Sequence, residues 1–169
     1  MRRLVLACPL WSVAFAAAAA EPVNVPGPHG GGAYYLTEQQ KEMHDAWGYA
    51  GAYRAGDFVY LSGVVTGSPD GAPLDAETFK EHLRRSFRYA GETLEAAGAS
   101  FEEVVDITSF HVWNSPAFPA GKIAHMEALA AVKREFMPAP DPAWTAIGVS
   151  ELLPDNGLVE IRMIAYAPQ

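Results

Sequence analysis

Cysteine is almost absent from this sequence: Cys8 is the only one in 169 residues. It lies in an N-terminal segment that we expect to be removed from the mature protein. The rest of the chain therefore has no thiol nucleophile, no disulfide and no thiolate metal site. A domain without such cross-links depends on its hydrophobic core or on oligomerisation for stability.

Positive charge is also scarce, with 12 Lys and Arg residues against 20 Asp and Glu residues and a net charge of −8. An acidic chain repels a phosphate backbone, so we expect no nucleic-acid partner. No P-loop, dinucleotide fingerprint or nucleophile elbow is present, and we expect no cofactor. His82, His111 and His125 lack the spacing of metal ligands, so we expect no metal site and place them at the surface or an interface.

The N-terminus has the pattern of a signal peptide. Arg2 and Arg3 precede the uncharged apolar run 4–20, which ends in five alanines. The run is shorter than a membrane span of about 20 residues and contains Pro9. We therefore expect residues 1–20 to be cleaved, the mature protein to be periplasmic or secreted, and no membrane association to remain.

Residues 21–46 are rich in proline and glycine, which interrupt regular structure. This composition predicts a flexible leader without regular elements. We expect one domain over residues 47–169, of ordinary size and apolar content for a globular fold.

The hydrophobic periodicity of that domain predicts the element order ββαβαββ. A Gly56-Asp57 hairpin signal separates the first two strands. Asp75 is the predicted N-cap of the first helix and Gly98 its stop. One mixed sheet with two helices on one face, an α+β architecture, is the simplest arrangement. The apolar content of both sheet faces favours an oligomer. The expected strands are 52–55, 58–62, 104–113, 144–149 and 158–166, and the expected helices are 76–97 and 119–136.

Four separate segments of this domain, in this order, are similar to one protein family. They are Tyr49 with the stretch 55–63, then 94–108, the stretch Pro-Ala-Trp-Thr-Ala-Ile-Gly-Val at 142–149, and Leu-Val-Glu-Ile at 158–161. The chain resembles the RidA/YjgF family, also called the endoribonuclease liver perchloric-acid-soluble protein family. The resemblance implies a chorismate-mutase-like fold, a homotrimer, and clefts between subunits that bind a small-molecule ligand.

Trp144 is a departure from the pattern of this family. In the family's imine deaminases an arginine at this position grips the substrate carboxylate bidentately, which needs a planar guanidinium. Indole has one N–H donor and no charge. Trp144 is either a stacking wall of a different ligand cleft or a packed interface aromatic. Ala146, two residues on, matches a position that is often polar in the deaminases, so polarity is lost there as well.

Other site positions match the family. Glu160 matches the glutamate that positions the hydrolytic water. Arg162 lies two residues on and either pairs with Glu160 or serves as a substitute anion anchor in the cleft. Tyr49 matches a tyrosine that lines the cleft, and Ser62-Gly63 matches backbone that approaches the ligand. The alternative for these three is a core tyrosine and a turn at a strand end.

Three functions follow from this pattern. The first is an exported RidA-like protein whose intersubunit cleft binds a small molecule without the usual carboxylate-clamp deaminase activity. The second is an imine or enamine deaminase that hydrolyses a substrate without a carboxylate, using Glu160 and a water molecule. The third, an endoribonuclease, has the least support because the chain is acidic.

Overall fold

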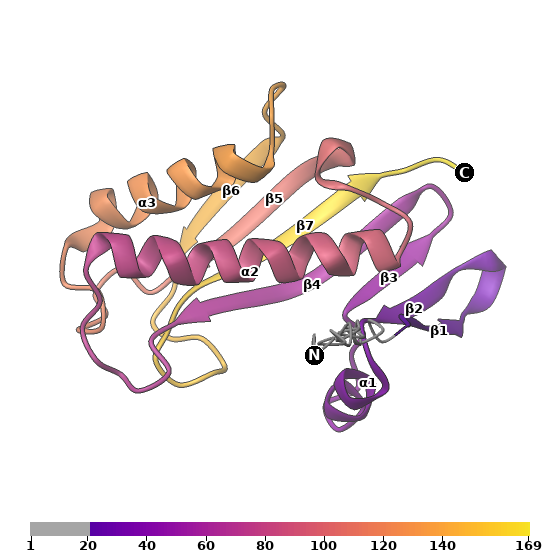
Figure 1. The fold of residues 1–169 in the computed structure, drawn as a ribbon, viewed down its shortest axis with the longest axis horizontal. Helices are drawn as coiled ribbons and strands as arrows, with labels where there is room; N and C mark the ends of the chain where they lie inside the picture. Colours follow the sequence, from indigo (N-terminus) through magenta and orange to yellow (C-terminus); the bar gives the residue numbers. More distant parts are fainter. Residues whose placement is uncertain (1–20) are drawn as a thin grey trace, which may run out of the picture.

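The computed structural model describes residues 21–169, so the predicted signal peptide lies outside the described residues. Its centre is one seven-stranded sheet in the order β1-β2-β3-β4-β7-β5-β6. Two helices, α2 and α3, cross the same face of this sheet (Figure 1). The strands are β1 (Val23–Pro26), β2 (Gly32–Tyr35), β3 (Ala52–Ala55), β4 (Phe58–Gly67), β5 (Val104–His111), β6 (Ala143–Gly148) and β7 (Gly157–Tyr166). The helices are α1 (Glu38–Asp45), α2 (Ala76–Ala96) and α3 (Gly121–Phe136), with short 3-10 turns at Pro28–Gly30 and Phe101–Glu103.

The predicted order ββαβαββ is confirmed as β3-β4-α2-β5-α3-β6-β7. The sheet is mixed, since β5 and β6 are parallel while the other neighbours are antiparallel. The carboxylate of Asp75 accepts a hydrogen bond of 2.7 Å from the backbone N–H of Thr78, as an N-cap does. Gly98 follows α2 with a φ of +73°, the left-handed conformation that ends many helices.

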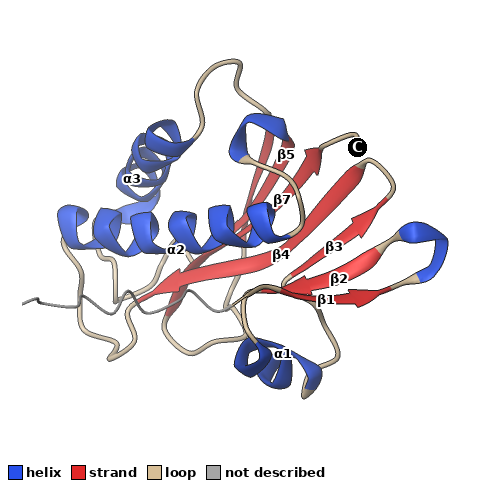
Figure 2. Cartoon of the chain, turned by 45° about the vertical axis from the view of Figure 1, so that its right-hand side comes forward, coloured by secondary structure: helices blue, strands red, loops and turns tan. Residues whose placement is uncertain are grey.

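The segment 21–46 is where the sequence-based expectation is wrong. It contains β1, β2 and α1, and the β1–β2 hairpin extends the sheet beyond β3 (Figure 2). The glycines and prolines gather in and around the hairpin loop, so they shape the turn without interrupting both strands. Thr37 caps α1 by accepting from the backbone N–H of Gln40 at 3.0 Å. Thr37-x-x-Gln40 is a capping-box pattern, which predicts the start of a helix. The high proline and glycine content of the segment argued against a helix.

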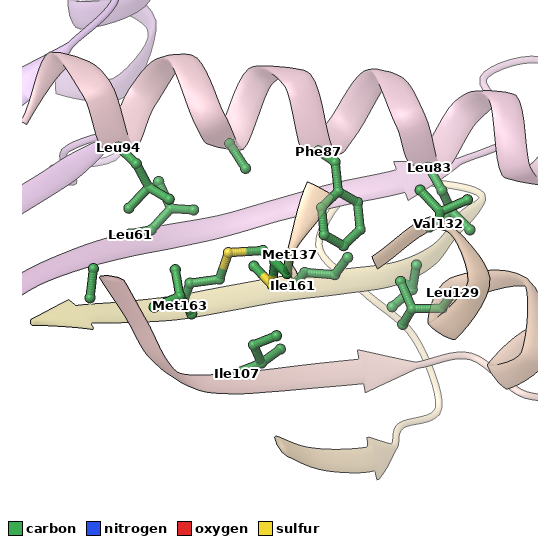
Figure 3. Packing of buried hydrophobic residues seen from close by; sticks show 14 of the residues in the cluster. Leu61, Leu83, Phe87, Leu94, Ile107, Leu129, Val132, Met137, Ile161 and Met163 are labelled. Atoms are coloured by element: carbon green, nitrogen blue, oxygen red, sulfur yellow. The ribbon is translucent and has the colours of Figure 1, made fainter. Parts of the chain in front are cut away.

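The core lies between α2, α3 and the covered face of the sheet. One stripe of α2, including Leu83, Phe87 and Leu94, packs on Leu61 and Met163 of the central strands (Figure 3). These side chains are at most 1% exposed. The spacing of the stripe at three and four residues explains why α2 buries a single face.

The other face of the sheet is uncovered in the single chain. Phe58 of β4 contacts Tyr166 of β7 there, with ring centroids 5.2 Å apart, and Tyr60 follows on the same face. All three rings are more than a third exposed. Within residues 21–169, no helix is long and apolar enough to cross a membrane.

Candidate functional site

A free edge of β4 borders a cavity of the described chain. β3 pairs only with the first half of β4, ending at Ala52 opposite Leu61, although β4 continues to Gly67. The sequence predicts a strand that ends at Ser62, whereas the structure continues it to Gly67. Two hydrogen bonds tie Ser62 to the chain before β3: its N–H donates to the carbonyl of Gly51 at 3.0 Å, and its hydroxyl donates to the carbonyl of Ala50 at 2.6 Å.

A β-bulge shapes β4 at this point. Its pairing with β7 passes from Leu61 opposite Met163 to Val64 opposite Ile161, so Ser62 and Gly63 together face Arg162. Bulges of this kind often lie next to active sites, because they redirect side chains. The bulge explains why the alternation of apolar residues in β4 is broken at Ser62 and Gly63.

The cavity beside the bulge has a volume of about 550 Å³. It brings together four of the residues predicted from the sequence: Tyr49, Ser62, Gly63 and Glu160. A mainly apolar wall with few polar groups is typical of small-molecule sites. The remaining wall consists of Trp47, Val65, Leu153 and Pro154.

Glu160 is the only acidic residue that lines this cavity. It lies on the uncovered face of β7, opposite Val65 of β4 and Phe110 of β5. Its side chain extends over Gly63, where a Cβ atom would overlap the carboxylate. No Lys, Arg or His of residues 21–169 forms an ion pair with it, and burial raises the pKa of its carboxyl group. A carboxylate with this environment is suited to general acid–base chemistry.

Arg162 does not pair with Glu160, so that part of the sequence interpretation is wrong. The described chain contains no ion pair of Arg162. It lies opposite Thr108 of β5, on the same sheet face as Glu160, but it is not among the residues that line the cavity. Glu160 is therefore without a neutralising partner in the single chain.

Tyr49 is positioned by α1, which the sequence analysis did not anticipate. Its ring stacks on the imidazole of His44 with centroids 4.2 Å apart and planes at 23°. His44 is 9% exposed, and burial lowers its pKa, which favours the neutral ring. The capping pattern at Thr37 was the signal that could have revealed this helix.

A second cavity, of about 420 Å³, adjoins the first. The two share Tyr49, Ser62 and Gly63 in their walls, together with Val65 and Pro154. We call the first the Glu160 chamber and the second the Arg85 chamber. The Arg85 chamber is also lined by His44 of α1, by Arg85, Ser86 and Tyr89 of α2, and by Gly51 and Val64.

Trp144 and Ala146 lie away from both chambers in the single chain. They are on β6, the strand at the opposite end of the sheet, two positions from β7 and thus roughly 10 Å away. The indole N–H of Trp144 donates to the hydroxyl of Ser109 at 2.8 Å, on the face that the helices cover. Ala146 is exposed next to it. Neither residue lines either chamber in the single chain.

His111 and His125, which the sequence predicts at the surface or an interface, are instead buried inside the single chain. The hydroxyl of Ser109 is 2.7 Å from Nε2 of His111, whose Nδ1 is 3.4 Å from Nε2 of His125. Both rings are at most 1% exposed, and burial lowers their pKa values to about 4 for His111 and about 3 for His125. The expected absence of a metal site stays a prediction; no cluster of three or more potential metal ligands occurs in residues 21–169.

Comparison with known proteins identifies the family. The sequence model of the family described as Endoribonuclease L-PSP matches residues 39–167. The RutC family protein YjgH of Escherichia coli is 36% identical over 122 residues, which cover 72% of this chain and 84% of that protein. A 2-iminobutanoate/2-iminopropanoate deaminase of Dermatophagoides farinae is 31% identical over 116 residues, 69% of this chain and 83% of the relative.

Solved structures agree with this result. The structure of protein YjgH has a TM-score of 0.57 at 34% identity and covers 75% of this chain and 89% of its own. The structure of RidA from an Antarctic Psychrobacter species has a TM-score of 0.55 at 29% identity, with coverage of 70% and 88%. On the match to most of its length and on these relatives, the chain belongs to the Endoribonuclease L-PSP family, which is the RidA/YjgF family.

Proposed function

We propose that the Glu160 chamber binds a small molecule with a carbon–nitrogen double bond and that Glu160 activates the water that hydrolyses it. The observation that supports this most is the position of the Glu160 carboxylate over Gly63, without a cationic partner and with a raised pKa. Such a group accepts a proton from water more readily than an ordinary glutamate does. Relatives of this chain are named as imine deaminases, which agrees with this reaction class.

The reaction balances with water as the only co-reactant. The water oxygen adds to the carbon of the protonated imine while one of its protons passes to Glu160, which leaves a neutral carbinolamine. Glu160 then returns that proton to the nitrogen of the resulting carbinolamine. Loss of ammonia and of the hydroxyl proton yields a carbonyl compound. The same carboxyl group thus serves as base and then as acid, which a pKa closer to neutrality assists.

The substrate that we propose has no carboxylate next to the reacting carbon. Trp144 stands where the deaminases resembled by this chain have their arginine, and its N–H is occupied by Ser109. Glu160 would also repel a second carboxylate beside it. An apolar or aromatic substituent fits the wall formed by Trp47, Leu153 and Pro154 better.

We further propose that three copies assemble so that each Glu160 chamber is completed by a neighbour. The exposed aromatic residues of the uncovered sheet face and the free edge of β4 are surfaces that such contacts would bury. Trp144 and Ala146 of one copy would then reach the chamber of another. A monomeric mass by light scattering would contradict this part of the proposal.

Export to the periplasm or medium is proposed from the N-terminal pattern, and N-terminal sequencing of the mature protein tests it.

Binding without turnover is the second candidate, and it is favoured by the loss of the arginine at Trp144. Purified protein is tested with a panel of imines generated in situ, with and without a carboxylate. If Glu160 is the base, Glu160→Gln lowers the rate of hydrolysis by a factor of about 100 or more. The control Glu102→Gln, on the 3-10 turn before β5, leaves the rate unchanged. Saturable ligand binding with no hydrolysis of any imine would support binding alone, and cleavage of RNA by the same preparation would support the endoribonuclease alternative.

A further inference from the structure

The Arg85 chamber contains a cation that no residue of the described chain neutralises. We propose that Arg85 binds a carboxylate at the far end of the ligand whose reacting carbon lies beside Glu160. This inference rests on the proposed function, because it uses the same ligand, and it identifies the ligand's second functional group. The two chambers are contiguous, since both are lined by Tyr49, Ser62 and Gly63.

Arg85 differs from its neighbour on α2 in its contacts. Arg84 donates to Glu81 at 2.5 Å and to Glu135 at 2.7 Å, so its charge is matched. Arg85 lines the chamber and is exposed, and residues 21–169 provide no acidic partner for it. The chain has a net charge of −8, so acidic residues outnumber basic ones, yet this guanidinium lines a cavity without an acidic partner. This arrangement points to an anionic ligand. Guanidinium groups bind carboxylates through paired N–H donors.

The other polar groups of the chamber suit an anionic ligand. The hydroxyl oxygen of Tyr89 accepts a hydrogen bond from the side-chain amide of Gln40, on α1. The phenol also carries a proton of its own, which it can donate. Burial raises the pKa of Tyr89, so this proton is retained. The chamber thus offers a charged donor and a neutral donor, whereas its lining residues contain no carboxylate.

The distribution of charge over the two chambers determines where the ligand's carboxylate lies. Glu160 is in the first chamber and Arg85 in the second, and each lines only one of the two. An acid group beside the reacting carbon would be repelled by Glu160, whereas one in the second chamber would be attracted by Arg85. The ligand class is therefore an imine whose carboxylate is separated from the C=N carbon by a spacer. One guanidinium matches a single negative charge, which favours a carboxylate over a phosphate dianion.

Isothermal titration calorimetry of the purified full chain tests the subsite with pentanoate and its neutral analogue pentanamide, at low ionic strength. We expect pentanoate to bind about tenfold more tightly than pentanamide. Arg85→Gln should remove this preference, and Arg85→Lys should retain part of it. Arg88→Gln is the matched control, because Arg88 lies on the same helix but lines a different cavity. Circular dichroism establishes that each variant is folded.

Equal affinity for pentanoate and pentanamide, or a preference for pentanoate that survives in Arg85→Gln, would overturn the proposal that Arg85 binds the carboxylate. Inorganic phosphate that competes with pentanoate as well as pentanoate itself would overturn the choice of a carboxylate. Glu160→Gln separates the two proposals: it should abolish hydrolysis without removing the preference for pentanoate. If hydrolysis needs Glu160 but the preference does not need Arg85, the subsite fails alone. If the preference needs Arg85 but hydrolysis does not need Glu160, the catalytic proposal fails alone.

Discussion

The carboxylate of Glu160 lies over Gly63, in the space where any other residue would have its Cβ atom. The two residues come from neighbouring strands, β7 and β4, and meet where the β-bulge turns β4 away from regular pairing. Glycine is required at position 63 for this steric reason and not for its backbone angle. The pair links the local geometry of the sheet directly to the position of the proposed catalytic group.

Gly63→Ala is expected to displace the Glu160 side chain. The overlapping atoms belong to the flexible end of Glu160, so the fold can adjust and the free energy of unfolding should change by less than about 1 kcal/mol. Hydrolysis should fall roughly as far as in Glu160→Gln. Steady-state kinetics and urea unfolding measure the two effects. An alanine variant with full activity would show that the carboxylate does not act from this position.

The raised pKa of Glu160 predicts how stability and hydrolysis change with pH. Burial favours the protonated form, so the charged form costs stability once the pH rises through the folded-state pKa. Glu160→Gln should therefore unfold at a higher urea concentration than the wild type at pH 7. Hydrolysis should be lost on acidification at a pH above 4.5, the ordinary value for glutamate. A pH–rate profile checks this, and a midpoint at or below that value would contradict it.

Trp144→Phe should destabilise the fold by about 1 kcal/mol, because the hydrogen bond from the indole to Ser109 is lost. A double-mutant cycle with Ser109→Ala, followed by urea unfolding, isolates the pair. Trp47→Phe is the control, since Trp47 is 73% exposed and its replacement should have no such effect. Additive losses in the cycle would indicate that the two side chains do not interact.

His111 and His125 should make the protein acid-sensitive. Both are neutral when folded, with pKa values of about 4 and about 3, against 6.5 when unfolded. Because these folded-state values are lowered, their contribution is complete above pH 6.5 and is lost as the pH falls. Between pH 7 and pH 5 the loss is about 2 kcal/mol for each ring. Urea unfolding at the two pH values measures it, and His125→Met should reduce the difference by about half.

Arg54 should be the most costly single arginine to replace. Its guanidinium is 3% exposed and donates to the carbonyls of Ala97, Gly98, Gly56 and Ala167 at 2.7–3.2 Å. Arg54→Met leaves these buried acceptors without a donor, and we expect a loss of about 3 kcal/mol. The surface control Arg88→Met should change stability by less than about 0.5 kcal/mol. Equal thermal midpoints for the two variants would contradict this account.

The sequence by itself determined the order of elements in the family domain. Hydrophobic spacing predicted α2 and its buried stripe, and Asp75 and Gly98 marked its ends correctly. The family resemblance likewise predicted the four positions that meet in the Glu160 chamber. These features were accessible because periodicity, capping and family resemblance are properties of short segments.

Tertiary structure alone decided which of these residues meet. Trp144 faces the helices and Glu160 faces the other side of the sheet. The alternation of side chains along a strand divides its residues into two sets, but only the pairing of the strands decides which set faces the helices. Arg162 remained without its expected partner, and His111 became part of the core. Segment 21–46 forms regular structure because β2 pairs with β3 and β1 pairs with β2, and these hydrogen bonds cannot be read from the composition of the segment. Arg85 is an exposed residue of α2, and it lines a cavity because His44 of α1 and Val64 of β4 lie beside it in the tertiary structure.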